Sequence, residues 1–233
     1  MNIVEHPAKA IYLANRHPRL TRDEFRQRWL THSEVGALLT GPPKPVVGLR
    51  YCLTVDPAGV LPVASNEHDG VGLLNLRDVV SIPAMHRVLT RNEVAFADEL
   101  RAFERAVEDV TVYAASELVV DGPETEFAVI EYARRRERVE PADYLRATAR
   151  SDDDDALIAA GVRRWVRNIN VGAAVRGFGY DTVTELWFDS LDAVAAARTE
   201  LDAFLERRAE HTERRASFVL VTTVVHQLGR SRP

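Results

Sequence analysis

The sequence predicts an α+β fold in which one chain carries two tandem βαββαβ units. Two observations predict it. Residues 68–76 (HDGVGLLNL) align without a gap with residues 180–188 (YDTVTELWF), and the two stretches share Asp, Val and Leu at equivalent positions. The same order of strand-like and helix-like runs also surrounds each stretch within the 233 residues. The repeat therefore predicts a fused dimer within a single chain.

The first half shows the order strand, helix, strand, strand, helix, strand. Apolar runs rich in β-branched and aromatic residues predict the strands over residues 9–15, 47–55, 71–76 and 110–120. Helical periodicity predicts one helix that begins at Thr21 and a second over residues 81–103.

The first helix has a recognisable start and a recognisable apolar face. Thr21 is followed three residues later by Glu24, which is the spacing of a capping box. Phe25, Trp29 and His32 then recur at steps of four and three, so these three side chains share one face of the helix.

The second helix also has an apolar side. Leu89, Phe96, Leu100 and Phe103 fall on this common side at helical spacing. The pattern predicts that these four side chains point the same way.

The second half repeats the order after a turn at residues 121–123 (DGP). We take this turn as the link between a first unit, residues 1–121, and a second unit, residues 122–233. Strands are predicted over residues 127–134, 162–171, 183–188 and 218–226, and helices over residues 141–150 and 192–208.

Several of the predicted strands are apolar on both faces, as over residues 127–130 and 218–221. A βαββαβ unit is the ferredoxin-like unit, and its helices cover only one face of its sheet. The other apolar face needs a partner, and the second unit can supply it. The sequence therefore predicts that the two sheets form a dimeric-type α+β barrel, with an apolar cavity between or beside them.

Composition excludes several classes of protein. The formal net charge of -5 lacks the basic footprint of a nucleic-acid binder. The single cysteine, Cys52, allows neither an internal disulfide nor a multi-cysteine zinc site. No apolar run approaches 18 residues and no basic-then-apolar leader opens the chain, so we expect a cytoplasmic protein without membrane partners.

His32 is the first candidate catalytic residue. It lies on the apolar face with Phe25 and Trp29, so we expect its ring to point into the interior. An imidazole titrates close to neutral pH and can accept and return a proton without a metal. The alternative is a core histidine that is hydrogen-bonded to a backbone carbonyl.

Glu185 is the second candidate catalytic residue. Val183, Glu185 and Trp187 share one face of a predicted strand, and an isolated carboxylate is costly on an apolar face. Desolvation is expected to raise the pKa of such a carboxyl group toward a useful range. The alternative is a salt bridge to an arginine of the neighbouring strand, namely Arg163, Arg164 or Arg167.

Further aromatic and amide side chains are candidates for binding a substrate through ring contacts or hydrogen bonds. They are Trp29, Tyr12, Tyr51, Tyr132, Asn168 and Trp187. The alternative for the aromatic residues is that they only fill the core. Asp69 and Asp181 recur in the repeat, where a turn or capping role is expected.

No metal site is expected. His68, His86 and His226 show no HxH, HxxxH or HExxH spacing with one another or with His32. The run of aspartates over residues 152–155 lacks the central glycine of a calcium loop. A single histidine can bind haem, so the sequence does not exclude haem, but no other feature of the sequence indicates a cofactor.

Two segments resemble a known family. Residues 19–25 (RLTRDEF) with residues 29–32 (WLTH) resemble the opening helix of EthD-domain proteins. Residues 180–191 resemble a later strand of the same family, in which an acidic residue, here Glu185, precedes an aromatic pair. In the first half Leu73 replaces that acidic residue, and the second half has no histidine near residues 144–150, so two full sites per chain are not expected.

The resemblance implies a tandem member of the dimeric α+β barrel superfamily, which includes cofactor-free lyases, isomerases and quinone-forming monooxygenases besides haem enzymes. We expect a cofactor-independent lyase, dehydratase or isomerase that acts by acid–base catalysis on a small cyclic or aromatic compound, with His32 as the base. The alternatives are a cofactor-free monooxygenase of a phenolic substrate and a non-catalytic binding protein that serves an oxygenase. Whether two chains pair as a homodimer stays open.

Overall fold

The structure is a computed structural model that describes residues 7–37, 45–91, 93–172 and 178–228. Its first half contains β1 (Ala8–Ala14), α1 (Arg22–Ala37), β2 (Val46–Thr54), β3 (Gly70–Leu76), α2 (Ile82–Arg91), α3 (Glu93–Ala102) and β4 (Thr111–Val120). Two 3-10 turns, η1 (Val79–Ser81) and η2 (Val107–Val110), flank α2 and α3.

The second half contains β5 (Phe127–Ala133), α4 (Pro141–Ala147), α5 (Asp155–Ala159), β6 (Arg164–Asn170), β7 (Thr182–Phe188), α6 (Leu191–Ala196), α7 (Arg198–Ala209) and β8 (Phe218–Leu228). A further 3-10 turn, η3 (Asp152–Asp154), precedes α5. The predicted strands are confirmed in number and order. The long helix predicted before the last strand of each half is instead two shorter helices, α2 and α3 in the first half and α6 and α7 in the second. In the second half the break falls at Ala197, whose ψ of 8° leaves the helical range.

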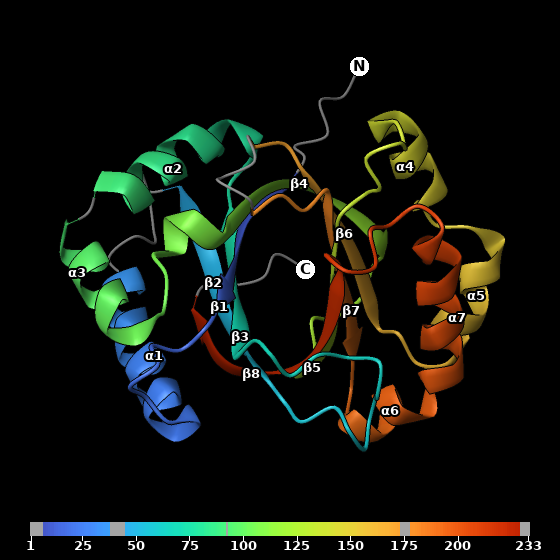
Figure 1. Cartoon of the computed structure of the whole chain (residues 1–233), viewed down its shortest axis with the longest axis horizontal. Helices are drawn as coiled ribbons and strands as arrows, with labels where there is room; N and C mark the ends of the chain where they lie inside the picture. The colour runs from blue at the N-terminus through green and yellow to red at the C-terminus, as the bar shows by residue number, and fades with distance from the viewer. Residues whose placement is uncertain (1–6, 38–44, 92, 173–177, 229–233) are drawn as a thin grey trace.

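The eight strands close into one antiparallel barrel in the order β1-β3-β2-β8-β5-β7-β6-β4, with β4 pairing back to β1. Each half contributes four adjacent strands, and the halves meet at β2–β8 and β4–β6. Figure 1 shows α1, α2 and α3 on one side of the barrel and α4 to α7 on the other. The predicted α+β barrel is confirmed.

The sequence repeat is a structural repeat. The Asp69 carboxylate accepts a hydrogen bond from the backbone N–H of Arg16 at 2.9 Å and forms an ion pair with the Arg16 guanidinium. Asp181 accepts from the backbone N–H of Arg135 at 2.8 Å and pairs with the Arg135 guanidinium at 3.1 Å. In both halves the aspartate therefore ties the end of the first strand to the start of the third. We call each such pair an Arg–Asp clamp.

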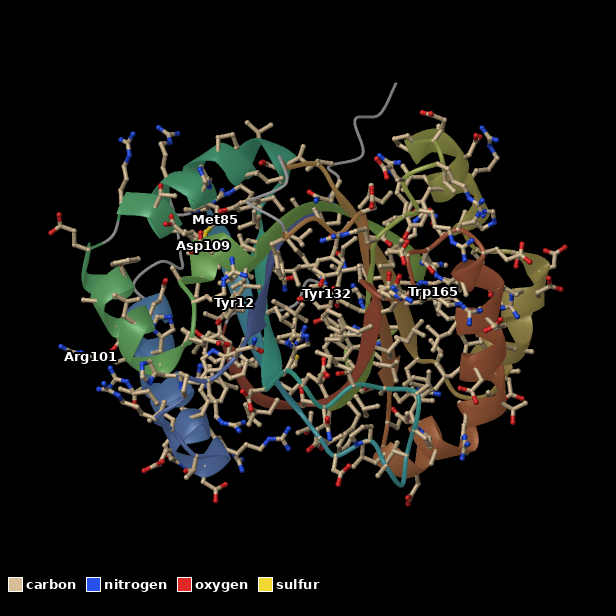
Figure 2. The ribbon with its side chains drawn as sticks, in the orientation of Figure 1. Tyr12, Met85, Arg101, Asp109, Tyr132 and Trp165 are labelled. Atoms are coloured by element: carbon tan, nitrogen blue, oxygen red, sulfur yellow. The ribbon has the colours of Figure 1, made fainter. Side chains whose placement is uncertain are left out.

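The alternation of side chains along the strands separates two interiors. Leu186 and Phe188 of β7 pack with Phe204 of α7, so this face of the sheet lies under the helices. Glu185 and Trp187 point the other way, into the barrel. Figure 2 shows Tyr132 within the ring of strands, whereas Trp165 lies between β6 and α7.

The start of α1 forms as the capping box predicts. The Thr21 backbone N–H donates to the Glu24 carboxylate at 2.8 Å, and the Glu24 backbone N–H donates to the Thr21 hydroxyl at 3.3 Å. These two bonds satisfy donors that have no partner within the helix. They fix where α1 begins, and hence which of its side chains face the sheet.

Candidate functional site

The candidate site lies in the first half, between the barrel wall and its helices, and is centred on Trp29 of α1. The Trp29 ring stacks on Phe25 at 5.2 Å and on Tyr51 of β2 at 4.7 Å between centroids. Its indole N–H donates to the Tyr12 hydroxyl at 2.9 Å. The indole is therefore held between two rings and by one hydrogen bond, and all four side chains are buried.

Phe103 joins this aromatic cluster to His32. Edge-on contacts connect the Phe103 ring to Tyr12 at 6.0 Å and to His32 at 5.4 Å. His32 is buried, as its place on the apolar face of α1 predicted. We call the set of Tyr12, Trp29, His32, Tyr51 and Phe103 the first-half site.

Within the part of the chain that the structure describes, His32 is hydrogen-bonded to a carboxylate and not to a backbone carbonyl. Its Nδ1 lies 2.8 Å from Oδ2 of Asp98 on α3, and Asp98 also forms an ion pair with Arg28. The carboxylate selects the tautomer that carries its proton on Nδ1, so the lone pair is on Nε2. Burial lowers the pKa of His32, and this keeps the ring neutral at pH 7. A neutral imidazole oriented by a carboxylate is the arrangement that a general base needs.

A second histidine approaches the site from the seam between the halves. The His226 ring of β8 lies 5.6 Å from the Tyr51 ring, since the two residues are paired across β2 and β8. Its Nε2 atom is buried and makes no hydrogen bond within the described part of the chain.

Sequence reasoning missed Glu99. This side chain is only 2% exposed, and its Oε2 accepts a hydrogen bond from the Val107 backbone N–H at 3.0 Å. Burial raises the pKa of the Glu99 carboxyl to about 7. The apolar side predicted for this helix is wrong in part, because Phe96 is 41% exposed and Leu100 is 49% exposed whereas Glu99 faces the core. Helical spacing gave no signal for Glu99, because it places Phe96 and Leu100 on the same face as the buried Phe103 equally well.

The described residues of the second half, 122–172 and 178–228, form no equivalent of this site. In sequence position, Tyr144 and Thr148 of the second half correspond to Phe25 and Trp29, because each pair follows the first residue of its helix by the same number of residues. Glu131 occupies the β5 position that corresponds to Tyr12, and it forms an ion pair with Arg208 at 3.1 Å. An ion pair thus stands where the first half has an aromatic cluster.

Four of the predicted site residues lie inside the barrel, away from His32. They are Tyr132, Asn168, Glu185 and Trp187, all fully buried. Glu185 therefore does not share a pocket with His32, although the sequence makes both of them candidate catalytic residues. The reason is geometric, because the two side chains lie on opposite faces of the barrel wall.

Glu185 is paired, but its partner is not one of the expected arginines. Its Oε1 lies 2.5 Å from Nζ of Lys9 on β1 and accepts from the Asn168 amide at 2.7 Å. Its Oε2 accepts from the Trp187 indole at 3.2 Å, and the Ser116 hydroxyl donates to the Asn168 oxygen at 2.7 Å. The barrel interior at this level is a satisfied polar network, not the apolar chamber that the sequence predicted.

The candidate site borders one cleft. A cleft of about 280 Å³ at the β2–β8 seam touches Phe25, and its other apolar walls are Leu53, Val224 and Val225. Phe25 stacks on Trp29, so the cleft lies next to the aromatic cluster, but none of the five residues of the first-half site lines it.

The described residues contain no cluster of three or more histidine, cysteine or carboxylate groups that could hold a metal ion. The histidines considered for such a site lie apart: His68 bonds Asn15 at 2.9 Å, and His86 contacts the Tyr113 hydroxyl at 3.3 Å. No helix in the described segments is long and apolar enough to cross a membrane.

Comparisons with known proteins place the fold but not the family. No protein-family model matches the chain, and no curated protein matches it. Solved structures do match along nearly the whole length. A protein of Fusobacterium nucleatum assigned as a monooxygenase has a TM-score of 0.62 at 8% identity, covering 98% of this chain and 96% of its own.

Two further structures extend the comparison. An anthrone oxidase-like protein has a TM-score of 0.61 at 12% identity, covering 99% of this chain and 98% of its own. A chlorite dismutase variant of Candidatus Nitrospira defluvii has a TM-score of 0.52 at 10% identity, covering 94% of this chain and 92% of its own. At these identities the likeness shows the fold alone, which is that of the dimeric α+β barrel proteins.

Proposed function

We propose that this chain is a cofactor-independent monooxygenase that oxidises an electron-rich phenolic or anthrone-like ring compound with dioxygen at the first-half site. The observation that carries the proposal is the His32–Asp98 pair, at 2.8 Å, set against a cluster of aromatic rings at a position where the second half has the Glu131–Arg208 ion pair. We also propose that the chain is an EthD-domain protein, because the segments around Trp29–His32 and Glu185 resemble that family.

The chemistry needs a base and a dry aromatic surface. The Nε2 atom of His32 takes a proton from the acidic C–H of the substrate, and the ring system holds the electron pair that remains. This electron-rich anion reduces dioxygen directly. A ring CH₂ and O₂ give a ring C=O and H₂O, so one oxygen atom enters the product and the other leaves as water.

The names of the structural neighbours favour oxygen chemistry over elimination. Two of the matching structures are assigned as monooxygenases and a third is anthrone oxidase-like. The same base would also serve a lyase or an isomerase, and a requirement for dioxygen separates these reactions. Ligand binding without any turnover would instead indicate the accessory binding protein.

The test is oxygen consumption by the purified chain with anthrone and a panel of polycyclic phenols, combined with product mass under ¹⁸O₂. We expect one labelled oxygen atom in the product. His32→Ala should lower turnover about 100- to 10,000-fold. His211→Ala, in the second half, should leave it unchanged. Full activity of His32→Ala, or turnover under nitrogen, would refute the proposal.

A further inference from the structure

A buried carboxyl group at the first-half site has no counter-charge. Glu99 makes no ion pair with any residue that the structure describes, and its carboxylate accepts a hydrogen bond from the Val107 backbone N–H. An ionised carboxylate in such surroundings is costly, and a neutral acid is much less so. A glutamate at this position therefore lowers the stability of the fold, which indicates that the acid has a function.

The second half shows how the same position can be filled without this cost. The Ala102 carbonyl accepts from the His17 N–H, and the His211 carbonyl accepts from the Arg136 N–H in the same way. Glu99 precedes Ala102 by three residues, and Arg208 precedes His211 by three, so Arg208 is the counterpart of Glu99.

Arg208, by contrast, has a counter-charge. It forms an ion pair with Glu131 at 3.1 Å and donates to the Thr148 carbonyl at 2.7 Å. Glu131 in turn is the counterpart of Tyr12. The half with the aromatic site thus has a tyrosine and an unpaired acid at the positions where the other half has an ion pair.

The repeat places Glu99 near Tyr12 of the aromatic site, because their counterparts Arg208 and Glu131 form an ion pair in the second half. Its backbone carbonyl accepts from the Phe103 N–H at 2.7 Å, and the residue lies one position after Asp98, which orients His32. Burial and the neighbouring Tyr51 raise the pKa of Tyr12, and the Glu99 carboxylate contributes in the same direction. Glu99 is also one of the charges that raise the pKa of Tyr51, after burial. The acid is therefore within electrostatic reach of both tyrosine hydroxyls.

We propose that Glu99 is a second catalytic group of the first-half site, a neutral carboxylic acid that donates a hydrogen bond to the substrate oxygen on which negative charge develops. The inference rests on the proposed function. When His32 removes a proton from ring carbon, the electron pair moves onto the conjugated carbonyl oxygen. The Glu99 O–H donates a hydrogen bond to that oxygen and keeps its own proton, so Glu99 is still a neutral acid at the end of the step.

This role narrows the substrate class. The compound must carry a carbonyl or hydroxyl oxygen conjugated with the acidic C–H, as in a ring ketone that enolises to a phenol. A neutral aromatic hydrocarbon, or a ring whose oxygen is blocked as a methyl ether in the enol form, offers no atom on which this charge can develop.

The first experiment measures the acid directly, without turnover. Infrared difference spectra of the ligand-free chain, recorded between pH 5 and pH 9, should show a protonated carboxyl band that disappears around neutral pH. Glu99→Gln should remove this band, and Glu93→Gln, an exposed position on the same helix, should keep it. A band that survives in Glu99→Gln would overturn the proposal whether or not the chain proves to be an oxygenase.

The second experiment measures function. Loss of one donor to a developing oxyanion costs about 100- to 1,000-fold in kcat, and we expect that loss in Glu99→Leu with anthrone. Glu99→Gln keeps a donor and should recover part of the rate while losing the alkaline limb of the pH profile. In parallel, 4-nitrophenol should bind at least tenfold more weakly to Glu99→Leu than to the parent chain.

The outcomes separate the two proposals. If no compound turns over, the monooxygenase assignment fails, and the infrared titration with the 4-nitrophenol affinity still decides the role of Glu99. If Glu99→Leu retains both the parent rate and the parent affinity, Glu99 is a structural acid and the inference is wrong.

Discussion

Lys9 and Glu185 form an ion pair inside the barrel, with Nζ and Oε1 2.5 Å apart, and each residue comes from a different half of the chain. The repeat places Ala128 at the position of Lys9 and Leu73 at the position of Glu185, because Ala14 pairs with Gly70 as Ala133 pairs with Thr182. The pair therefore has no symmetry-related copy. Lys9 is one of only two lysines in the sequence.

This ion pair predicts a non-additive mutant cycle. Glu185→Leu leaves the Lys9 ammonium buried without its partner, and Lys9→Met leaves the carboxylate uncompensated, so each single change should cost about 3–5 kcal/mol in the free energy of unfolding. The double variant Lys9→Met/Glu185→Leu removes both charges and should cost far less than the sum. Urea denaturation of the four proteins measures the cycle. Additive losses would show that the pair does not act as a unit.

Close contact between β3 and an aromatic ring predicts the effect of a single methyl group. A Cβ built on Gly72 meets the Tyr12 ring at 2.1 Å, so Gly72→Ala must displace Tyr12 and with it the hydrogen bond to Trp29. We expect a loss of about 3 kcal/mol, at the upper end for overpacking, together with a change in tryptophan fluorescence. Gly59→Ala is the matched control, because nothing lies within 4 Å of its Cβ, and it should leave both unchanged.

Burial of Glu99 predicts a pH dependence of stability. Its pKa rises from an ordinary value of 4.5 to about 7 in the folded chain. Between these values the unfolded chain has lost the proton that the folded chain retains, so this group's contribution falls as the pH rises from about 4.5 to above 7. The loss amounts to about 3 kcal/mol once both states are ionised.

Thermal unfolding at pH 5 and pH 8 measures this effect by comparison of variants. Glu99→Gln should flatten the pH dependence in this window, and Glu93→Gln should not. An identical slope in Glu99→Gln and the parent chain would show that Glu99 is ionised in the folded chain like an ordinary glutamate.

The Arg–Asp clamps predict that two distant substitutions have matching effects. Asp69→Ala and Asp181→Ala each leave one backbone N–H without its acceptor, that of Arg16 after β1 and that of Arg135 after β5. Each change should lower the free energy of unfolding by about 1–3 kcal/mol. Because the clamps lie in different halves and share no partner, the double variant should show the sum within experimental error. Asp153→Ala, at an exposed aspartate, is the control for loss of a surface charge. A much larger loss in one half would show that the repeated geometry is not equally important in both.

The sequence by itself determined the architecture. Apolar periodicity fixed the number and order of the strands, the Thr21–Glu24 spacing fixed the start of α1, and the alignment of Asp69 with Asp181 identified a repeat that the clamps reproduce. It also placed Trp29 and His32 on the buried face of α1. These features are local, because hydrogen bonding and side-chain alternation act over a few residues.

Tertiary structure alone decided which of these side chains meet. Nothing near Glu185 in the sequence points to Lys9, 176 residues away, and nothing near His32 points to Asp98. Sequence patterns give the face of a strand but not which face is turned inward when eight strands close into a ring. Closure placed Glu185, Asn168 and Trp187 inside the barrel and His32 outside it, and turned Glu99 rather than Phe96 toward the core. Charges then paired across the barrel because burial leaves an unpaired charge too costly to keep.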